Sequence, residues 1–144
     1  MHPTARWLIP LTVACAPQAA QAAEYTLLIY EAPSEFARRA DSGPAGQRYW
    51  QDYAAYGDAM KQAGILRGGA ALQGERDART TTGAGGDIAV VKGAHAASAH
   101  TLGGYFVVDV DTLDSALAWA ARAPAARLGG AVEVRPNVAA PMMR

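Results

Sequence analysis

The spacing of apolar residues along the chain changes several times, and each change predicts a new strand or helix. The run YTLLIYE at residues 25–31 is rich in aromatic and branched aliphatic side chains, which is typical of a strand. Residues 32–46 contain several prolines and glycines and predict a loop or a short broken helix. From residue 47 onward, bulky side chains recur at steps of four and three, as on one helix face: Tyr49, Tyr53, Tyr56, Met60 and Ala63.

Gly64 ends that helix in this interpretation, and residues 65–72 return to a strand. Its internal pair Gly68-Gly69 suggests a bulge or a close backbone approach. Two short strands, 79–82 and 88–92, then flank a glycine-rich turn. Residues 103–110 predict another strand, and 131–136 (AVEVRP) predict the last one.

Between those final strands, Asp111 or Thr112 can cap a helix by accepting the free N–H groups of its first turn. Pro124 ends this second helix. Its spacing predicts a buried face that comprises Leu113, Ala116, Leu117 and Ala120.

The order of elements predicts an α+β fold, namely a ferredoxin-like split βαβ arrangement with an inserted β-hairpin. In that arrangement the helices cover only one face of the sheet. The strands at 25–31 and 103–110 nevertheless carry apolar residues on both faces. We therefore expect a homodimer, a dimeric α+β barrel in which a second copy covers the other face.

The N-terminus has the layout of a secretory signal peptide. Arg6 precedes a short apolar run at residues 7–16, and Ala20-Gln21-Ala22 is a small-x-small cleavage site. We therefore divide the chain into a signal peptide at residues 1–23, a domain at 24–138 and a C-terminal tail at 139–144. We expect an exported protein, periplasmic or secreted, with no membrane segment after processing. The alternative is a cytoplasmic protein whose extension is no signal.

Composition narrows the classes of partner and cofactor. Thirteen basic residues balance thirteen acidic ones without a basic stripe, so a nucleic-acid partner has no electrostatic basis. Cys15 is the only cysteine and is lost on processing, unless it is a lipidated first residue. The remaining chain offers neither a disulfide framework nor cysteine ligands for a metal. We therefore predict no cofactor and no metal.

Several segments together resemble the YCII-related family, in particular its branch named after a DGPF motif. The resemblance covers residues 24–138 and rests on YTLLIYE, KQAGIL, GGAAL, LGGYFVVDVDTLDSALAWAARAP and VEVRP. It implies a ferredoxin-like dimeric barrel of mostly unassigned function. Some relatives in the wider family are lyase-like enzymes that act on small ring compounds through a histidine–aspartate pair.

The chain departs from that pattern at two places. The branch motif falls at residues 92–95, where only its glycine, Gly93, is present. The family's catalytic histidine lies on the first helix, at the position that Tyr53 occupies here. The histidine–aspartate mechanism is therefore not carried over to this chain.

His95 and His100 are the candidate catalytic residues, because histidine suits proton transfer near neutral pH. Both lie in the loop where the family motif falls. The alternative is a solvated loop, and their five-residue spacing fits no known metal motif. The candidate ligand-binding residues are Tyr53, Tyr30, Glu31 and Tyr105.

Each of these ligand candidates also has a simpler explanation. Tyr53 belongs to the apolar stripe of the first helix, where packing alone accounts for it. The leading interpretation is a YCII-like protein that binds a small molecule between the first helix and the sheet, as a dimer. The alternatives are a lyase- or hydrolase-type enzyme with a histidine proton-transfer group, and a structural or interaction module.

Overall fold

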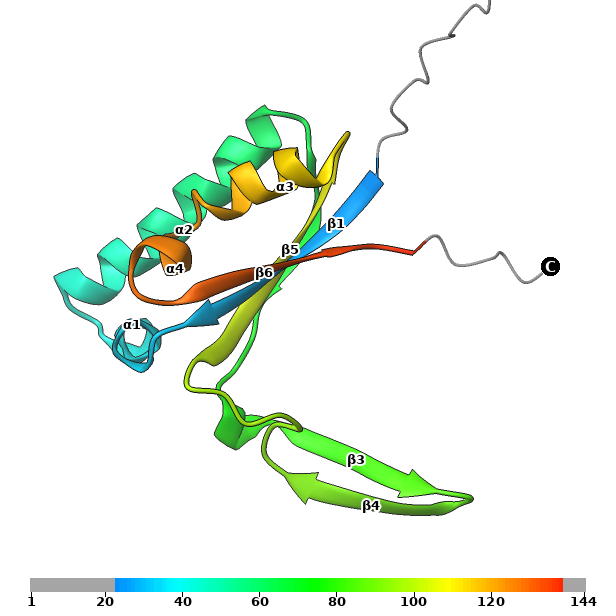
Figure 1. Cartoon of the computed structure of the whole chain (residues 1–144). Helices are drawn as coiled ribbons and strands as arrows, with labels where there is room; N and C mark the ends of the chain where they lie inside the picture. Colours follow the sequence, from blue (N-terminus) through cyan, green and yellow to red (C-terminus); the bar gives the residue numbers. More distant parts are fainter. Residues whose placement is uncertain (1–22, 139–144) are drawn as a thin grey trace, which may run out of the picture.

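A four-stranded antiparallel sheet in the order β2-β5-β1-β6 forms the centre of the protein (Figure 1). The computed structural model describes residues 23–138, so residues 1–22 of the predicted signal peptide, with Cys15, and the tail at 139–144 lie outside the described residues. The strands are β1 (Ala23–Glu31), β2 (Leu66–Ala71), β3 (Arg79–Ala84), β4 (Asp87–Lys92), β5 (Thr101–Val110) and β6 (Ala131–Pro136). The helices are α1 (Pro33–Ala37), α2 (Pro44–Gln62), α3 (Leu113–Ala120) and α4 (Pro124–Arg127), with short 3-10 turns η1 (Arg38–Ala40) and η2 (Glu75–Asp77).

The order of strands confirms the predicted α+β fold. Helix α2 lies in the connection from β1 to β2, and β5 lies between these two strands in the sheet. β1 in turn lies between β5 and β6. This is the split βαβ topology of ferredoxin-like folds. Strands β3 and β4 form a separate two-stranded sheet, which is the predicted inserted hairpin.

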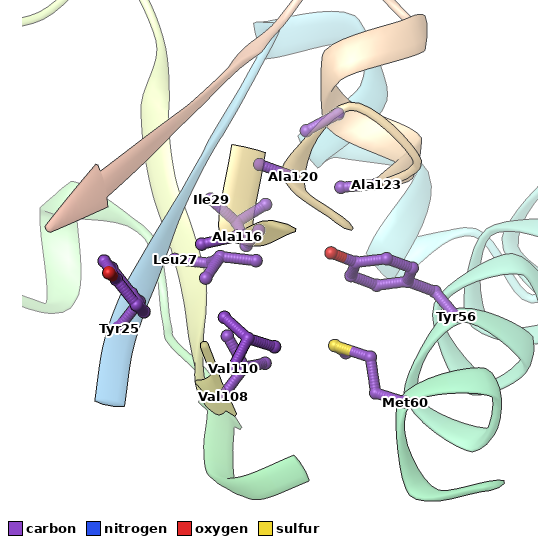
Figure 2. Close-up of a cluster of buried hydrophobic side chains, with 11 residues drawn as sticks. Tyr25, Leu27, Ile29, Tyr56, Met60, Val108, Val110, Ala116, Ala120 and Ala123 are labelled. Atoms are coloured by element: carbon purple, nitrogen blue, oxygen red, sulfur yellow. The ribbon is translucent and has the colours of Figure 1, made fainter. Parts of the chain in front are cut away.

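The hydrophobic core lies between the sheet and helices α2 and α3. On the sheet side, Leu27 and Ile29 of β1 are almost completely buried, and on the helix side so is Met60 of α2. Figure 2 shows Met60 and Tyr56 of α2 pointing toward the side chains of the sheet. The hydroxyl of Tyr56 donates a hydrogen bond to the Trp119 carbonyl at 3.0 Å, which ties α2 to α3.

Helix α2 follows the predicted stripe but begins earlier than its apolar spacing indicated. It starts at Pro44, a residue whose fixed φ and missing N–H suit the first helical position. Tyr49, Tyr56 and Met60 are buried as predicted, Tyr53 is half-buried, and Ala63 at the end is exposed.

The predicted buried face of α3 was half wrong. Thr112 caps the helix as expected, because its side chain accepts the Ser115 N–H at 3.1 Å. Ala116 and Ala120 are buried, but Leu113 and Leu117 are 44% and 47% exposed. The two alanines face the sheet, so the leucines lie in the neighbouring row of the helix surface, away from the core.

The sheet face opposite the helices, here called the open face, carries half-buried apolar side chains. Figure 1 shows α2, α3 and α4 on the other side of the sheet. Strand register places the open-face residues opposite one another across β1, β5 and β2. The apolar members are Leu28, Tyr30, Leu102, Tyr105 and Val107.

The β3–β4 hairpin projects from the end of the sheet, away from the helix layer (Figure 1). Gly85 and Gly86 form its two-residue turn with φ of 64° and 108°, a conformation that glycine adopts without strain. Every residue of β4 is exposed. Among the described residues, none of the helices is both long and apolar enough to cross a membrane.

Candidate functional site

A pocket of about 210 Å³ lies between α2 and the β2–β5 half of the sheet. β1 and η1 close one end of it. Its lining comes from five parts of the sequence that the fold brings together. The lining residues are Ile29, Glu31, Arg39, Tyr49, Trp50, Tyr53, Gly69, Ala70, Ala71, Gly103, Gly104, Tyr105 and Phe106.

The pocket exists because the sheet carries almost no side chains beneath the start of α2. Gly69, Ala71 and Gly104 occupy neighbouring positions of β2 and β5. A Cβ atom added to Gly104 or to Gly69 would lie 2.7 Å from a backbone carbonyl oxygen. These glycines therefore allow close strand contacts and leave open space under the helix.

Aromatic rings form most of the wall opposite that floor. The Tyr49 and Tyr53 rings lie 4.9 Å apart and tilted, and the Trp50 ring meets Tyr49 edge-on at 5.1 Å. Phe106 closes the far side and packs edge-on against Tyr56 at 5.4 Å. Such rings offer apolar faces against which another flat ring can stack.

One end of the pocket is polar and is built around the buried carboxylate of Glu31. Glu31 is completely buried, although it is the last residue of β1. The Arg39 Nη2 atom donates to its Oε1 at 2.5 Å, and the Tyr49 hydroxyl lies 2.9 Å from both carboxylate oxygens. Arg39 also donates from Nε to the Tyr49 hydroxyl at 2.5 Å, so the three side chains form a closed network.

Arg39 links this network to the surrounding backbone. Its Nη1 donates to the Leu72 carbonyl at 2.7 Å and its Nη2 to the Gly103 carbonyl at 2.6 Å. Its guanidinium group also stacks over the Phe36 ring at 4.5 Å. A Cβ atom at Gly103 would overlap the Glu31 carboxylate, so glycine is required there for the pair to form.

Burial is the dominant influence on the titration of these groups. It raises the pKa of Glu31 above its usual value, because the charged carboxylate loses its hydration, while the Arg39 charge and the hydrogen bonds partly offset this. Burial and the Glu31 charge likewise raise the pKa of Tyr49 and that of Tyr53. Both phenols therefore stay protonated at neutral pH, and the Tyr49 hydroxyl can donate to Glu31.

Two of the four predicted ligand-binding residues lie at the centre of this site. Glu31 anchors the polar end, and Tyr53 lines the wall from α2. Tyr105 of β5 borders the pocket, but its side chain points to the open face, because it lies opposite Leu28 in register. Tyr30 does not reach the pocket, because it lies on the open face, opposite Leu102 of β5.

His95 and His100 lie away from this pocket. They line a shallow groove beside the open face, together with Tyr30, and their loop connects β4 to β5. The His100 Nε2 atom is 3.0 Å from the Gly129 carbonyl. The structure thus separates the histidines from the Glu31 network, and residues 23–138 contain no cluster of His, Cys, Asp or Glu suited to hold a metal ion.

Sequence reasoning missed Arg39 as a site residue and assigned Tyr49 to the core only. Arg39 lies in the irregular segment between β1 and α2, where apolar spacing gives no information. Its partners come from residues 31, 49, 72 and 103, which only the folded chain brings together. The pair Gly103-Gly104 within a strand was the one available signal of a close approach.

The fold and the pocket define a small α+β domain with a concave site of the size of a small molecule. Residues 23–138 match the YCII-related domain family, which is most of the chain. The chain therefore belongs to the YCII-related family, as the sequence resemblance implied. The search of curated proteins found no match.

Proposed function

We propose that the protein is a small-molecule-binding homodimer whose ligand occupies the pocket between α2 and the sheet. The observation that carries the proposal is the combination of an apolar, ring-lined space with one preorganised polar end. Ligand sites in proteins have this composition, with few polar groups that fix orientation. The Glu31–Arg39–Tyr49 network supplies those groups, and their mutual hydrogen bonds hold them in place.

The volume of the pocket supports a ligand of about one ring. An apolar cavity of roughly 150 Å³ accepts benzene, so about 210 Å³ accommodates one ring with a small substituent. Drug-sized ligands need pockets of roughly 300 Å³ or more. We therefore propose a compact ring compound.

The charge of the polar end supports a neutral ligand. The Glu31 carboxylate and the Arg39 guanidinium neutralise each other at 2.5 Å. A ligand with a full charge would meet no unpaired opposite charge there and would lose its hydration on entry. A hydroxyl, carbonyl or lactone group can instead exchange hydrogen bonds with the network.

The open face supports the dimeric part of the proposal. Its apolar side chains include Tyr105 and Val107 of β5, and no helix of the described chain covers them. Apolar patches of this kind on a sheet usually mark a contact with another protein surface. A two-fold contact of the open face with itself covers both copies at once.

A thermal-shift screen of residues 23–144 tests the binding proposal. The panel comprises neutral phenols, indoles and lactones, with benzoate and benzylamine as charged comparisons. At a concentration of 100 Kd a ligand adds about 2.7 kcal/mol, which raises Tm by roughly 4 °C for each kcal/mol. We expect neutral compounds to raise Tm and the charged ones to leave it unchanged.

A pocket-filling variant provides the specificity control. Ala71 lines the pocket, so Ala71→Leu occupies part of the space while the three side chains of the Glu31 network are all kept. Ala54→Leu adds the same side chain on the exposed face of α2. Ala71→Leu should abolish the ligand-induced shift and Ala54→Leu should keep it. Equal shifts in both variants would place the ligand elsewhere.

Light scattering tests the dimer. We expect twice the chain mass for the wild type and a monomer for Val107→Glu on the open face. Leu117→Glu is the matched control, because Leu117 is exposed on the helix side. A monomeric wild type at micromolar concentration would contradict the dimeric part of the proposal and leave the pocket in place.

A further inference from the structure

We infer that the β3–β4 hairpin is an exchanged arm, whose apolar face packs against a second copy of the chain beside the open sheet face. This inference rests on the proposed dimer but concerns a different part of the surface. Neither the pocket nor the core of its own chain uses the hairpin. Its role therefore has to come from a contact outside the protomer.

The hairpin exposes large apolar side chains that nothing in its own chain covers. Ile88 is 62% exposed, Val90 68% and Val91 52%. Strand alternation places Ile88 and Val90 on one face of the hairpin, and Ala89 and Val91 on the other. A two-stranded hairpin is only marginally stable in water without such a covering surface.

The charges of the hairpin are confined to its two ends. Arg79 and Lys92 lie opposite each other in register at the base of the hairpin, and Asp87 lies at its tip. The middle, residues 80–83 and 88–91, has no charged side chain. Exposed strand edges are usually protected by charged residues or proline, so an uncharged hairpin with two free edges is typical of a segment that is covered in the assembly.

The hairpin and the open face are on the same side of the molecule. Figure 1 shows the hairpin projecting away from the helix layer, past the end of the sheet. The hairpin therefore extends on the side of the sheet that carries the open face. A protein that contacts the open face is therefore also within reach of the hairpin.

The charge pattern of the open face favours a second copy as that body. Arg67 is paired with Asp109 at 2.7 Å, and Arg135 with Glu133 at 2.6 Å. Each pair is neutral within its own chain, so these four residues bring no net charge to a contact with an identical face. In a two-fold dimer each copy donates one arm and accepts one, so both arms are covered by the same contact.

Charge substitution on the hairpin tests the arm while leaving the rest of the fold intact. The double variant Ile88→Asp/Val90→Asp places two carboxylates on the proposed contact face. Ala89→Asp places one on the opposite hairpin face. By sedimentation, we expect the double variant to raise the dimer Kd at least tenfold and Ala89→Asp to change it less than twofold.

A second variant removes the arm altogether. Arg79 and Lys92 lie opposite each other in register, so a short Gly-Ser linker can replace residues 80–91. Because the pocket and the core are unchanged, this variant should have a circular dichroism spectrum typical of the wild-type α+β domain. Its dimer Kd should rise at least tenfold, as in the double variant. Wild-type dimer affinity in this variant, or in the double variant, overturns the arm and leaves the sheet-face dimer standing.

Hydrogen exchange on the wild type gives a direct readout. The backbone amides of residues 79–92 should be protected at concentrations well above Kd and lose that protection on dilution. Exchange that is rapid at every concentration while the protein remains dimeric also overturns the arm. A wild type that is monomeric throughout overturns both the arm and the dimer.

Discussion

Removing Arg39 should destabilise the protein strongly, because it leaves a charged carboxylate buried without its partner. Glu31 is completely buried, and the Arg39 side chain is only 14% exposed. Loss of one member of a buried ion pair costs about 3–5 kcal/mol. Arg39→Met keeps most of the aliphatic volume, so the loss reports mainly on the charge and its hydrogen bonds. We expect a decrease of about 3–5 kcal/mol in the free energy of unfolding at pH 7.

A double-mutant cycle separates the pair from its surroundings. Glu31→Leu should be similarly costly, because it leaves the Arg39 guanidinium without its carboxylate. The double variant should lose less than the sum of the two single losses, since apolar residues of similar volume often replace a buried pair at little net cost. Urea unfolding at one fixed protein concentration measures all four chains, so that any self-association affects the apparent stability of each of them at the same concentration.

The exposed pair Arg67–Asp109 is the control for this cycle. Its side chains are 44% and 22% exposed, and exposed pairs contribute about 0–1 kcal/mol. Arg67→Met should therefore cost less than about 1 kcal/mol. A loss for Arg39→Met as small as the loss for Arg67→Met, or fully additive losses in the Glu31–Arg39 cycle, would refute the reasoning.

Four further predictions concern the same region and the histidine loop. Gly103→Ala should cost about 2–3 kcal/mol in urea unfolding, because the new methyl group overlaps the Glu31 carboxylate. The pKa of Glu31 is raised above 4.5 in the folded state, so the contribution of Glu31 to stability should be fully present below pH 4.5 and decrease as pH rises through the folded pKa. Unfolding measured as a function of pH should show this decrease in the wild type and not in Glu31→Gln. Tyr53→Phe should cost less than about 1 kcal/mol, and Tyr53→Ala roughly 3 kcal/mol, in thermal unfolding; an alanine variant of normal stability would show that the ring does not pack. The double variant His95→Ala/His100→Ala should lose no more than about 1.5 kcal/mol, because His95 is exposed and the half-buried His100 makes one hydrogen bond to the Gly129 carbonyl. A catalysed reaction lost in that variant would favour the enzyme alternative.

The sequence was sufficient for the order and type of the main elements because each carries a strong local signal. The helical stripe from Tyr49 to Met60 and the alternating strands specify which faces are buried. Gly68-Gly69 correctly indicated the bulge that the structure places between Leu66 and Gly68. The predicted location of the pocket, between the first helix and the sheet, follows from the same elements.

The polar end of the pocket could not be predicted in the same way. Its members lie in different elements, and the position of Arg39 depends on how the irregular segment after β1 folds back over Glu31. The prediction that Leu113 and Leu117 are buried was wrong for a related reason. Apolar spacing alone does not determine which of two neighbouring rows of a helix faces the sheet. Both cases require the tertiary packing that local patterns do not contain.

The most direct test of the central claim is to map where a small neutral ring compound binds. Amide chemical shifts of the labelled protein, recorded with and without a phenol or lactone that raises Tm, would locate the contact residue by residue. We predict changes concentrated at Tyr53, Gly69 and Gly104, and their loss in Ala71→Leu. Changes confined to the histidine loop or to the open face, with the pocket amides unmoved, would contradict the account.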